Sequence, residues 1–375
     1  MLAQRRARRR RRLILLGAAV AVAAAANLAG VGPAVVGRPL DAIAPRGAAT
    51  PTTPATGVLL AVPSESDPHA AFVLVGPGAD GETPVTLIPG ATQVEVPSLG
   101  SRTLTEALAA GGPRAARVAV ANALGVRVGG VVVVEPEVLG SAFGASGLFR
   151  VRLREPVEVA GRPWAAGEHE VGATHIAALV AAPSDDGFGR LLVLHAILEG
   201  WLESADSATV DAAAARLADG AEAGGTSVAT AVTALRRQGA RFDTLDVDTV
   251  TVPGSTRYTV TSAGEKEVAE AFDHLVTSRS ERPKVEILNG TGAPGLAMQV
   301  AERIVPEGFR VVLTGNAKDF GHQETVLVVH DEHHEAAARR LAGTLGVGVL
   351  RTPSDPVSVV DISIVVGADF GPGGE

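Results

Sequence analysis

The chain has 375 residues, a formal net charge of −8 at pH 7 and no cysteine. Without cysteine, a disulfide framework and a thiolate metal site are both excluded, so the fold must be stabilised by its hydrophobic core. A chain that is acidic overall is not expected to bind nucleic acid, and its length is ample for two domains with ordinary cores.

The first predicted element is a single transmembrane helix. Arginines crowd residues 1–12, and residues 13–33 are apolar over about the length that a bilayer core requires, roughly 20 residues. Because arginine-rich flanks stay in the cytoplasm, we expect residues 1–12 to be cytoplasmic and the chain after residue 33 to be extracytoplasmic. The alternative is a cleaved signal peptide, since Ala24–Ala26 offers a small-residue cleavage site.

Residues 34–56 mix proline, glycine, alanine and threonine without periodicity, which predicts a linker. A mixed α/β domain is expected over residues 57–278, because short apolar runs alternate with turn-rich stretches and helical patterns. Its strands are predicted at Val58–Val62, Ala71–Val75, Val85–Ile88 and Val131–Val134. Its helices are predicted at Leu104–Ala110, Leu191–Glu203, Ala208–Leu217, Ser227–Gln238 and Lys266–Val276.

A polar run closed by Pro283 separates this part from a smaller α/β domain over residues 284–370. Its strands are predicted at Val285–Leu288, Arg310–Leu313, Thr325–Val329, Val347–Leu350 and Val359–Val366, and its helices at Gly295–Ile304 and Glu335–Leu345. The fold class predicted for the whole chain is therefore α/β, with an N-terminal transmembrane helix, a mixed-sheet α/β domain and a small C-terminal α/β domain.

Two motifs in the second domain resemble ligand sites but are interpreted as structural. Gly290–Gly295 has the dinucleotide-binding glycine pattern, yet no acidic residue ends the next predicted strand, so a tight turn is favoured. His330, His333 and His334 are spaced as metal ligands could be. Because Asp331 is able to cap a helix there, the entry to a helix is favoured over a metal cluster.

Four C-terminal motifs are similar to a known module. They are Val285-Glu286-Ile287-Leu288-Asn289-Gly290, Gly292-Ala293-Pro294-Gly295-Leu296-Ala297, Gly308-Phe309-Arg310-Val311 and Val366-Gly367-Ala368-Asp369-Phe370. In this order they resemble the LytR C-terminal domain of bacterial envelope proteins, over about Lys284 to Phe370.

The upstream residues resemble the LytR-CpsA-Psr domain, which often precedes that module. The motifs that carry the resemblance are Leu87-Ile88-Pro89, Gly111-Gly112-Pro113, Gly125 followed by Val131–Glu135, and Gly187-Phe188-Gly189-Arg190. The resemblance covers Gly57 to about Val276. It implies an enzyme that transfers a glycopolymer phosphate from a polyprenyl pyrophosphate carrier to peptidoglycan, with arginines holding the pyrophosphate and aspartates holding magnesium.

The chain departs from that family where the family carries charge. Gly90-Ala91 replaces an arginine-aspartate pair, and Gln93 replaces a further arginine. Other arginine positions fall in Val180–Pro183 and Leu191–Val193, so Arg190 alone of that cluster stays in register. Because a single lost donor can cost about a hundredfold in rate, transfer activity is not expected.

Residual ligand contacts remain as candidates at Arg190, Asp67, Asp185, Asp186 and Arg102. Asp67 lies close to the family's aspartate position, which falls near His69. For Arg190, a surface or structural ion pair and a residual ligand contact remain equal alternatives. Asp185 and Asp186 are favoured as turn residues. Arg102, like Arg114 and Arg117, is favoured as a solvated surface cation.

The predicted function is that of a membrane-anchored envelope protein with a degenerate LytR-CpsA-Psr-like domain. It would bind a polyprenyl-linked or cell-wall glycopolymer ligand, or act as an adaptor, without catalytic residues and without a cofactor. The alternative is an active phosphotransferase, which would need magnesium. A purely structural tether would be favoured if no pocket existed. The apolar content of Leu191–Leu198 is compatible with a polyprenyl groove and with an ordinary buried helix.

Overall fold

The computed structural model describes residues 56–65, 68–77, 82–184, 187–219, 221–223, 231–232, 234–235, 239–252, 255–278, 280–352 and 359–371. The predicted cytoplasmic segment 1–12, the predicted helix 13–33 and nearly all of the predicted linker 34–56 lie outside these residues. Within the described ranges, no helix is long and apolar enough to cross a bilayer.

The first domain is built on a six-stranded sheet in the order β11-β6-β1-β2-β3-β12. These strands are β1 (Gly57–Val62), β2 (Ala71–Val75), β3 (Thr83–Pro89), β6 (Val128–Val133), β11 (Ala221–Ala223) and β12 (Ala240–Thr244). β1, β2 and β3 pair antiparallel, whereas β6 is parallel to β1 and β12 is parallel to β3. The central strands are near-continuous apolar runs, as strands covered on both faces require.

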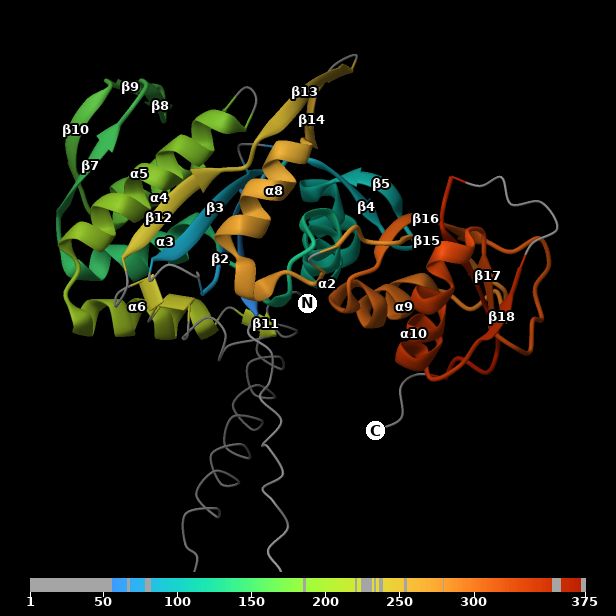
Figure 1. Ribbon diagram of the computed structural model, residues 1–375. Helices are drawn as coiled ribbons and strands as arrows, with labels where there is room; N and C mark the ends of the chain where they lie inside the picture. The colour runs from blue at the N-terminus through green and yellow to red at the C-terminus, as the bar shows by residue number, and fades with distance from the viewer. Residues whose placement is uncertain are drawn as a thin grey trace, which may run out of the picture. The chain divides into compact units, whose positions relative to one another are not determined.

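Helices cover both faces of this sheet. Leu59, Phe72 and Ile88 belong to the hydrophobic cluster of one face, which includes α2 (Leu104–Leu124) and α8 (Ser262–Ala271). Val73 and Leu87 point to the opposite face, because side chains alternate along a strand. There they pack with the helices that are green in Figure 1, namely α3 (Pro136–Phe143), α4 (Ala173–Ala181), α5 (Phe188–Ser204) and α6 (Ser207–Asp219).

Helix α2 extends well beyond the predicted Leu104–Ala110. Thr103 and Glu106 form a reciprocal capping box at its N-terminus. The helix breaks at Gly112, whose φ of 68° and ψ of −172° are not helical, and it resumes at Pro113. It ends at Leu124, and the following Gly125 adopts the left-handed conformation that favours glycine.

Short antiparallel pairs complete the first domain. These are β4 (Gln93–Val96) with β5 (Gly100–Thr103), β7 (Phe149–Leu153) with β10 (Gly167–Val171), β8 (Val157–Val159) with β9 (Arg162–Trp164), and β13 (Val247–Val252) with β14 (Ser255–Val260). Two 3₁₀ turns, η1 (Gly144–Ser146) and η2 (Asp273–Leu275), follow α3 and α8. The predicted helix Lys266–Val276 is therefore wrong at its end, since α8 stops at Ala271.

The second domain has a five-stranded sheet in the order β16-β15-β19-β17-β18. These strands are β15 (Lys284–Asn289), β16 (Arg310–Asn316), β17 (Val326–Val329), β18 (Val349–Arg351) and β19 (Ile362–Val366). Only the β17–β19 pair among them is antiparallel. The helices α9 (Leu296–Ile304) and α10 (Glu335–Leu345) pack on the sheet, and η3 (Val305–Glu307) and η4 (Glu332–His334) adjoin them.

The two structural interpretations in this domain agree with the structure. The Asn289 carboxamide oxygen accepts the N–H groups of Thr291 and Gly292, which forms the predicted tight turn. Gly290 approaches the main chain closely, because an added Cβ there would lie 2.7 Å from the Val366 carbonyl oxygen. Asp331 caps η4 by accepting the His333 N–H, as expected for a helix entry.

Candidate functional site

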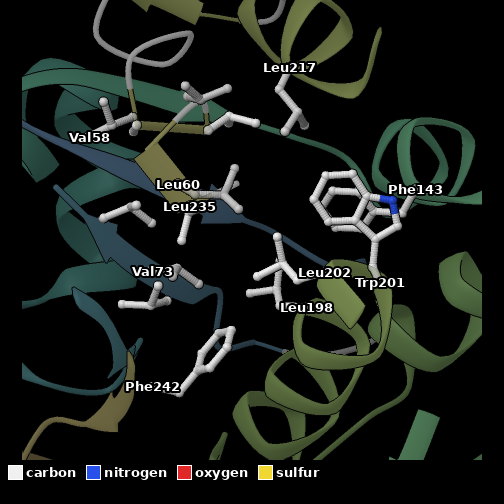
Figure 2. A pocket seen from close by; sticks show the side chains of 15 residues that line it. Val58, Leu60, Val73, Phe143, Leu198, Trp201, Leu202, Leu217, Leu235 and Phe242 are labelled. Atoms are coloured by element: carbon white, nitrogen blue, oxygen red, sulfur yellow. The ribbon is translucent and has the colours of Figure 1, made fainter. Parts of the chain in front are cut away.

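An apolar cavity lies between the sheet of the first domain and its helices α5 and α6. Fifteen residues line it, and all carry apolar or aromatic side chains: Val58, Leu60, Val73, Val75, Val85, Val132, Phe143, Leu198, Trp201, Leu202, Leu217, Ala231, Val232, Leu235 and Phe242. The cavity volume is about 60 Å³, within a wider space of about 650 Å³ between the lining atoms that is partly open to solvent. Figure 2 shows Val73 and Phe242 on one side of this space and three α5 residues on the other.

Regular spacing in the sequence produces the two walls. Val58 and Leu60 are two residues apart on β1, so both side chains leave the same face of the sheet. Leu198, Trp201 and Leu202 are three or four residues apart on α5, so they share one face of that helix. The alternation of side chains along β1 thus supplies one wall of the cavity, and the helical repeat of α5 supplies the other.

Trp201 is the largest side chain of the wall and is only 2% exposed. Its indole packs on the Phe143 ring, with the ring centroids 4.4 Å apart. The indole Nε1 has no hydrogen-bond partner among the described residues. An indole in such surroundings will report a change in the polarity of the cavity through its fluorescence.

His195 adjoins the cavity through Phe242, with the two rings stacked at 4.6 Å. Burial lowers the pKa of the His195 imidazole, and the carboxylate of Glu199, 4.0 Å from Nε2, opposes that shift. The imidazole is therefore neutral at pH 7, and it places no fixed positive charge beside the apolar walls. His195 is itself partly buried, with 12% of its side chain exposed.

Arg190 lies in the interior, so its interpretation as a surface residue is wrong. The residue is 2% exposed. Its Nε donates to the carbonyl of Val180 at 2.7 Å, Nη1 donates to that of His69 at 2.8 Å, and Nη2 donates to that of Pro63 at 2.7 Å. A guanidinium has five N–H donors, so three are committed to the main chain. Arg190 thus holds three segments together.

Of the other predicted contacts, the structure describes only Arg102. Arg102 is exposed on β5, where its Nε donates to the Leu99 carbonyl. Asp67, Asp185 and Asp186 lie outside the described residues. Segments that flank them do meet, because an added Cβ at Gly187 would lie 3.3 Å from the Cβ of His69.

A polar cavity borders the first turns of α5. Its volume is about 410 Å³, and its polar lining comes from Arg154, Glu155, Glu158, Ser184 and Arg190. Among the described residues, no three histidine, aspartate or glutamate side chains are grouped to hold a metal ion.

Position 90, where the sequence resemblance would place an arginine, is closed by the fold. An added Cβ at Gly90 would lie 2.1 Å from the Ala70 carbonyl oxygen and 2.4 Å from Thr105 Oγ1. The Thr105 hydroxyl itself donates to the Gly90 carbonyl at 3.0 Å. At the other arginine positions, Val180 and Leu191 are buried in the apolar core.

Sequence reasoning missed most of the walls of the apolar cavity. Phe143, Trp201 and Phe242 were not singled out, although the spacing of Leu198 and Trp201 along α5 is a signal for a shared helix face. Both interpretations of Leu191–Leu198, a polyprenyl groove and an ordinary buried helix, apply to part of this stretch. Leu198 lines the cavity, whereas Leu191 and Leu194 are ordinary core residues.

Comparisons with known proteins identify the second domain. Residues 282–370 match the family described as LytR cell envelope-related transcriptional attenuator, which confirms the prediction for the C-terminal residues. No curated protein matches the chain significantly in sequence.

Solved structures with a similar fold include TagV of B. subtilis, with 14% identity, a TM-score of 0.45, and coverage of 57% of this chain and 94% of TagV. They also include a LytR-Csp2A-Psr enzyme from Actinomyces oris, with 16% identity, a TM-score of 0.46, and coverage of 58% and 89%. TagT bound to LI-WTA has 15% identity, a TM-score of 0.48, and coverage of 61% and 94%. At these values none of them assigns a function to this chain.

Proposed function

We propose that this protein binds the hydrocarbon chain of a polyprenyl-linked cell-wall glycopolymer intermediate in its apolar cavity. In this role it is a binding or adaptor protein of glycopolymer assembly at the cell envelope. The observation that carries the proposal is the cavity itself, whose fifteen lining side chains are all apolar or aromatic. Apolar surface removed from water there would contribute about 25 cal/mol per Å² to binding.

The proposed location suits such a ligand. A helix at residues 13–33 would anchor the chain in the membrane, with residues 1–12 in the cytoplasm and the folded part outside. A polyprenyl carrier is itself held in that membrane by its hydrocarbon chain. The match of residues 282–370 to an envelope-related family supports the same compartment.

Three observations favour binding without phosphotransfer. Position 90, where the resemblance places an arginine, has no room for a side chain beyond glycine. Val180 and Leu191 are buried where further arginines would be needed. The one arginine in register, Arg190, holds main-chain carbonyls with three of its donors. A pyrophosphate requires several charge-assisted donors at once.

The alternative of an active phosphotransferase is favoured by one feature, the polar cavity that Arg154 and Arg190 both line. Magnesium would then be the required cation, and Asp67, Asp185 and Asp186 would be its candidate ligands. This alternative predicts that ligand binding depends on magnesium.

Tryptophan fluorescence tests the proposal directly. The chain has two tryptophans, so a Trp164→Phe variant of residues 57–375 leaves Trp201 as the only reporter. Titration with a short-chain polyprenyl pyrophosphate should give a saturable change in Trp201 emission that does not require magnesium. Inorganic pyrophosphate alone should give none.

A variant that fills the cavity provides the matched comparison. Val73→Phe places a larger ring in the wall and should abolish the change in emission. Leu313→Phe is the control, because Leu313 is 43% exposed in the second domain and does not line the cavity. Binding that survives Val73→Phe would refute the cavity as the site. Transfer of glycopolymer to peptidoglycan by the purified protein would refute the non-catalytic role.

A further inference from the structure

Asn122, in the last turn of α2, binds the edge of the second domain's sheet. It is 3% exposed. Its Nδ2 donates to the Val311 carbonyl at 2.7 Å, and its Oδ1 accepts the Val311 N–H at 2.8 Å. Val311 lies on β16, an edge strand, where a buried N–H and carbonyl would otherwise lack partners. One carboxamide therefore replaces a neighbouring strand at this residue.

Arg282 binds the C-terminal end of the same helix from the start of the second domain. Its Nη1 donates to the Asn122 carbonyl at 2.7 Å, and its Nη2 donates to the Ala123 carbonyl at 3.2 Å. A cation at this end of a helix also opposes the negative end of the helix dipole. Burial lowers the pKa of Arg282 to about 10, so the guanidinium is still charged at neutral pH.

Two carboxylates complete the contact. Glu302 on α9 accepts from Arg114 Nε at 2.7 Å and from Arg117 Nη2 at 2.8 Å. Glu265 on α8 lies 3.0 Å from Arg310 Nη2 and 3.9 Å from Arg282 Nη2. Arg114 is a surface cation as expected, with 55% of its side chain exposed, whereas Arg117 is 27% exposed. Both arginines also pair with Glu302 of the second domain, which was not expected.

We infer that these residues form a polar clasp that holds the second domain rigidly on α2 and α8. The clasp is defined as Asn122, Arg282, Arg114, Arg117 and Glu302 with their partners Val311, Glu265 and Arg310. Around it, apolar residues of both domains, such as Val118 and Ile304, belong to one continuous hydrophobic cluster. Residues 53–375 accordingly form one compact unit.

Helix α2 is also the link between the clasp and the first domain's loops. At its first turn, Thr105 Oγ1 donates to the Gly90 carbonyl and accepts the Ala70 N–H. At its last turn, Asn122 binds β16. The second domain is therefore held at a fixed position relative to the first, instead of hanging on a flexible tether after residue 278.

Spin labels measure this rigidity in the full-length chain, kept in mild detergent because residues 13–33 are apolar. The absence of native cysteine allows labelling at Lys266→Cys and Arg339→Cys, two exposed positions in different domains. The inference predicts one narrow distribution of label-to-label distances. A broad distribution in this parent would overturn it.

The same distance measurement on variants of the clasp residues tests which contacts produce the rigidity. Asn122→Leu and, separately, Glu302→Lys should each lose the narrow peak. Arg114→Glu with Arg117→Glu should restore it in the Glu302→Lys background, because the charges are then exchanged. Asn122→Leu should also speed amide hydrogen exchange at Val311. The control is Arg152→Ala, which removes an exposed ion pair with Glu168 inside the first domain and should leave the peak narrow. A narrow peak in every clasp variant would overturn the inference.

Discussion

At position 190 one guanidinium reaches the carbonyl oxygens of Val180, His69 and Pro63, which belong to three different segments. Pro63 and His69 lie in loops and Val180 lies in the last turn of α4, where carbonyl groups have no regular backbone partner, so a buried donor must supply one. Arg190 donates the hydrogen bonds that these carbonyl groups would otherwise lack.

Removal of this side chain should therefore cost stability first. We expect Arg190→Ala to lower the free energy of unfolding by about 3 kcal/mol or more, since hydrogen bonds to a charged group contribute roughly 1.5–3 kcal/mol each. Denaturant unfolding measures this, with Arg102→Ala as the exposed control, expected to change by less than about 0.5 kcal/mol. A folded Arg190→Ala variant of unchanged stability would contradict the structural role.

The sequence could identify Arg190 as the arginine in register but not its task. A residue name carries no information on whether a guanidinium faces a ligand or three carbonyls from segments up to 127 positions away. The same holds for Gly90, where the missing charge is readable but the contact with Ala70 is not. Asn122 had no signal at all, because its partner Val311 is 189 residues away.

At the scale of elements, replacement of a helical glycine by alanine is expected to change stability in opposite directions at two positions. Gly140 lies in α3, and an added Cβ there would be 2.4 Å from the Ala173 carbonyl oxygen of α4. Gly343 lies in α10, where an added Cβ meets no atom within 4 Å. The first glycine permits two helices to touch, whereas the second only weakens its own helix.

Gly140→Ala should accordingly destabilise the protein by about 1–3 kcal/mol, the usual cost of overpacking. Gly343→Ala should stabilise it by roughly 0.5–1 kcal/mol, because alanine loses less backbone entropy in a helix. Thermal unfolding of both variants beside the parent measures the two signs. Equal shifts would mean that α3 and α4 do not pack as closely as described.

Elements were predicted correctly where apolar residues repeat with the helical period over three or more turns. The predicted helix Glu335–Leu345 coincides with α10, and Leu191–Glu203 falls within α5. Strand β18 begins at Val349 and not at Val347, because Gly346 and Gly348 both have positive φ. Residues 136–181 carry no predicted element, although the alternation of Phe149–Leu153 was a signal for a strand half exposed to solvent.

At the scale of the whole molecule, acid should weaken the contact between the domains. The hydrogen bond from Arg114 lowers the pKa of Glu302 below its ordinary value of 4.5, and the charges of Arg114 and Arg117 add to this. A group with a lowered folded-state pKa stabilises the protein fully above its unfolded-state value, and this stabilisation is lost as pH falls through the folded-state value.

The midpoint of thermal unfolding should be measured at a series of pH values from 6 down to 3. It should decrease once the pH is below about 4.5, and it should decrease more steeply in the parent than in Glu302→Gln. The variant lacks the titrating group and should be less stable than the parent at pH 6. Parallel curves for the two proteins would show that Glu302 does not contribute through its charge.

The N-terminal expectation is tested at the same scale. If residues 13–33 anchor the chain, the protein should stay in the membrane fraction after alkaline washing. The mass of the intact protein, measured by mass spectrometry, should then correspond to a chain that still contains residues 1–33. Protease added to the outside of spheroplasts should digest the folded part. A mature protein that begins near residue 27 would instead establish the cleaved signal peptide.

Among the fifteen lining side chains only the Trp201 indole carries a hydrogen-bonding group, which limits what the cavity can discriminate. Directional donors and acceptors are what reject a close analogue, whereas an extra or missing methylene changes binding by only about 1–3 kcal/mol. The fifteen lining side chains should therefore sort hydrocarbons by length and cross-section, with little regard for their chemical origin. Alkyl detergents fit that description, so a preparation extracted with them would arrive already filled and would have to be exchanged before any lipid is measured.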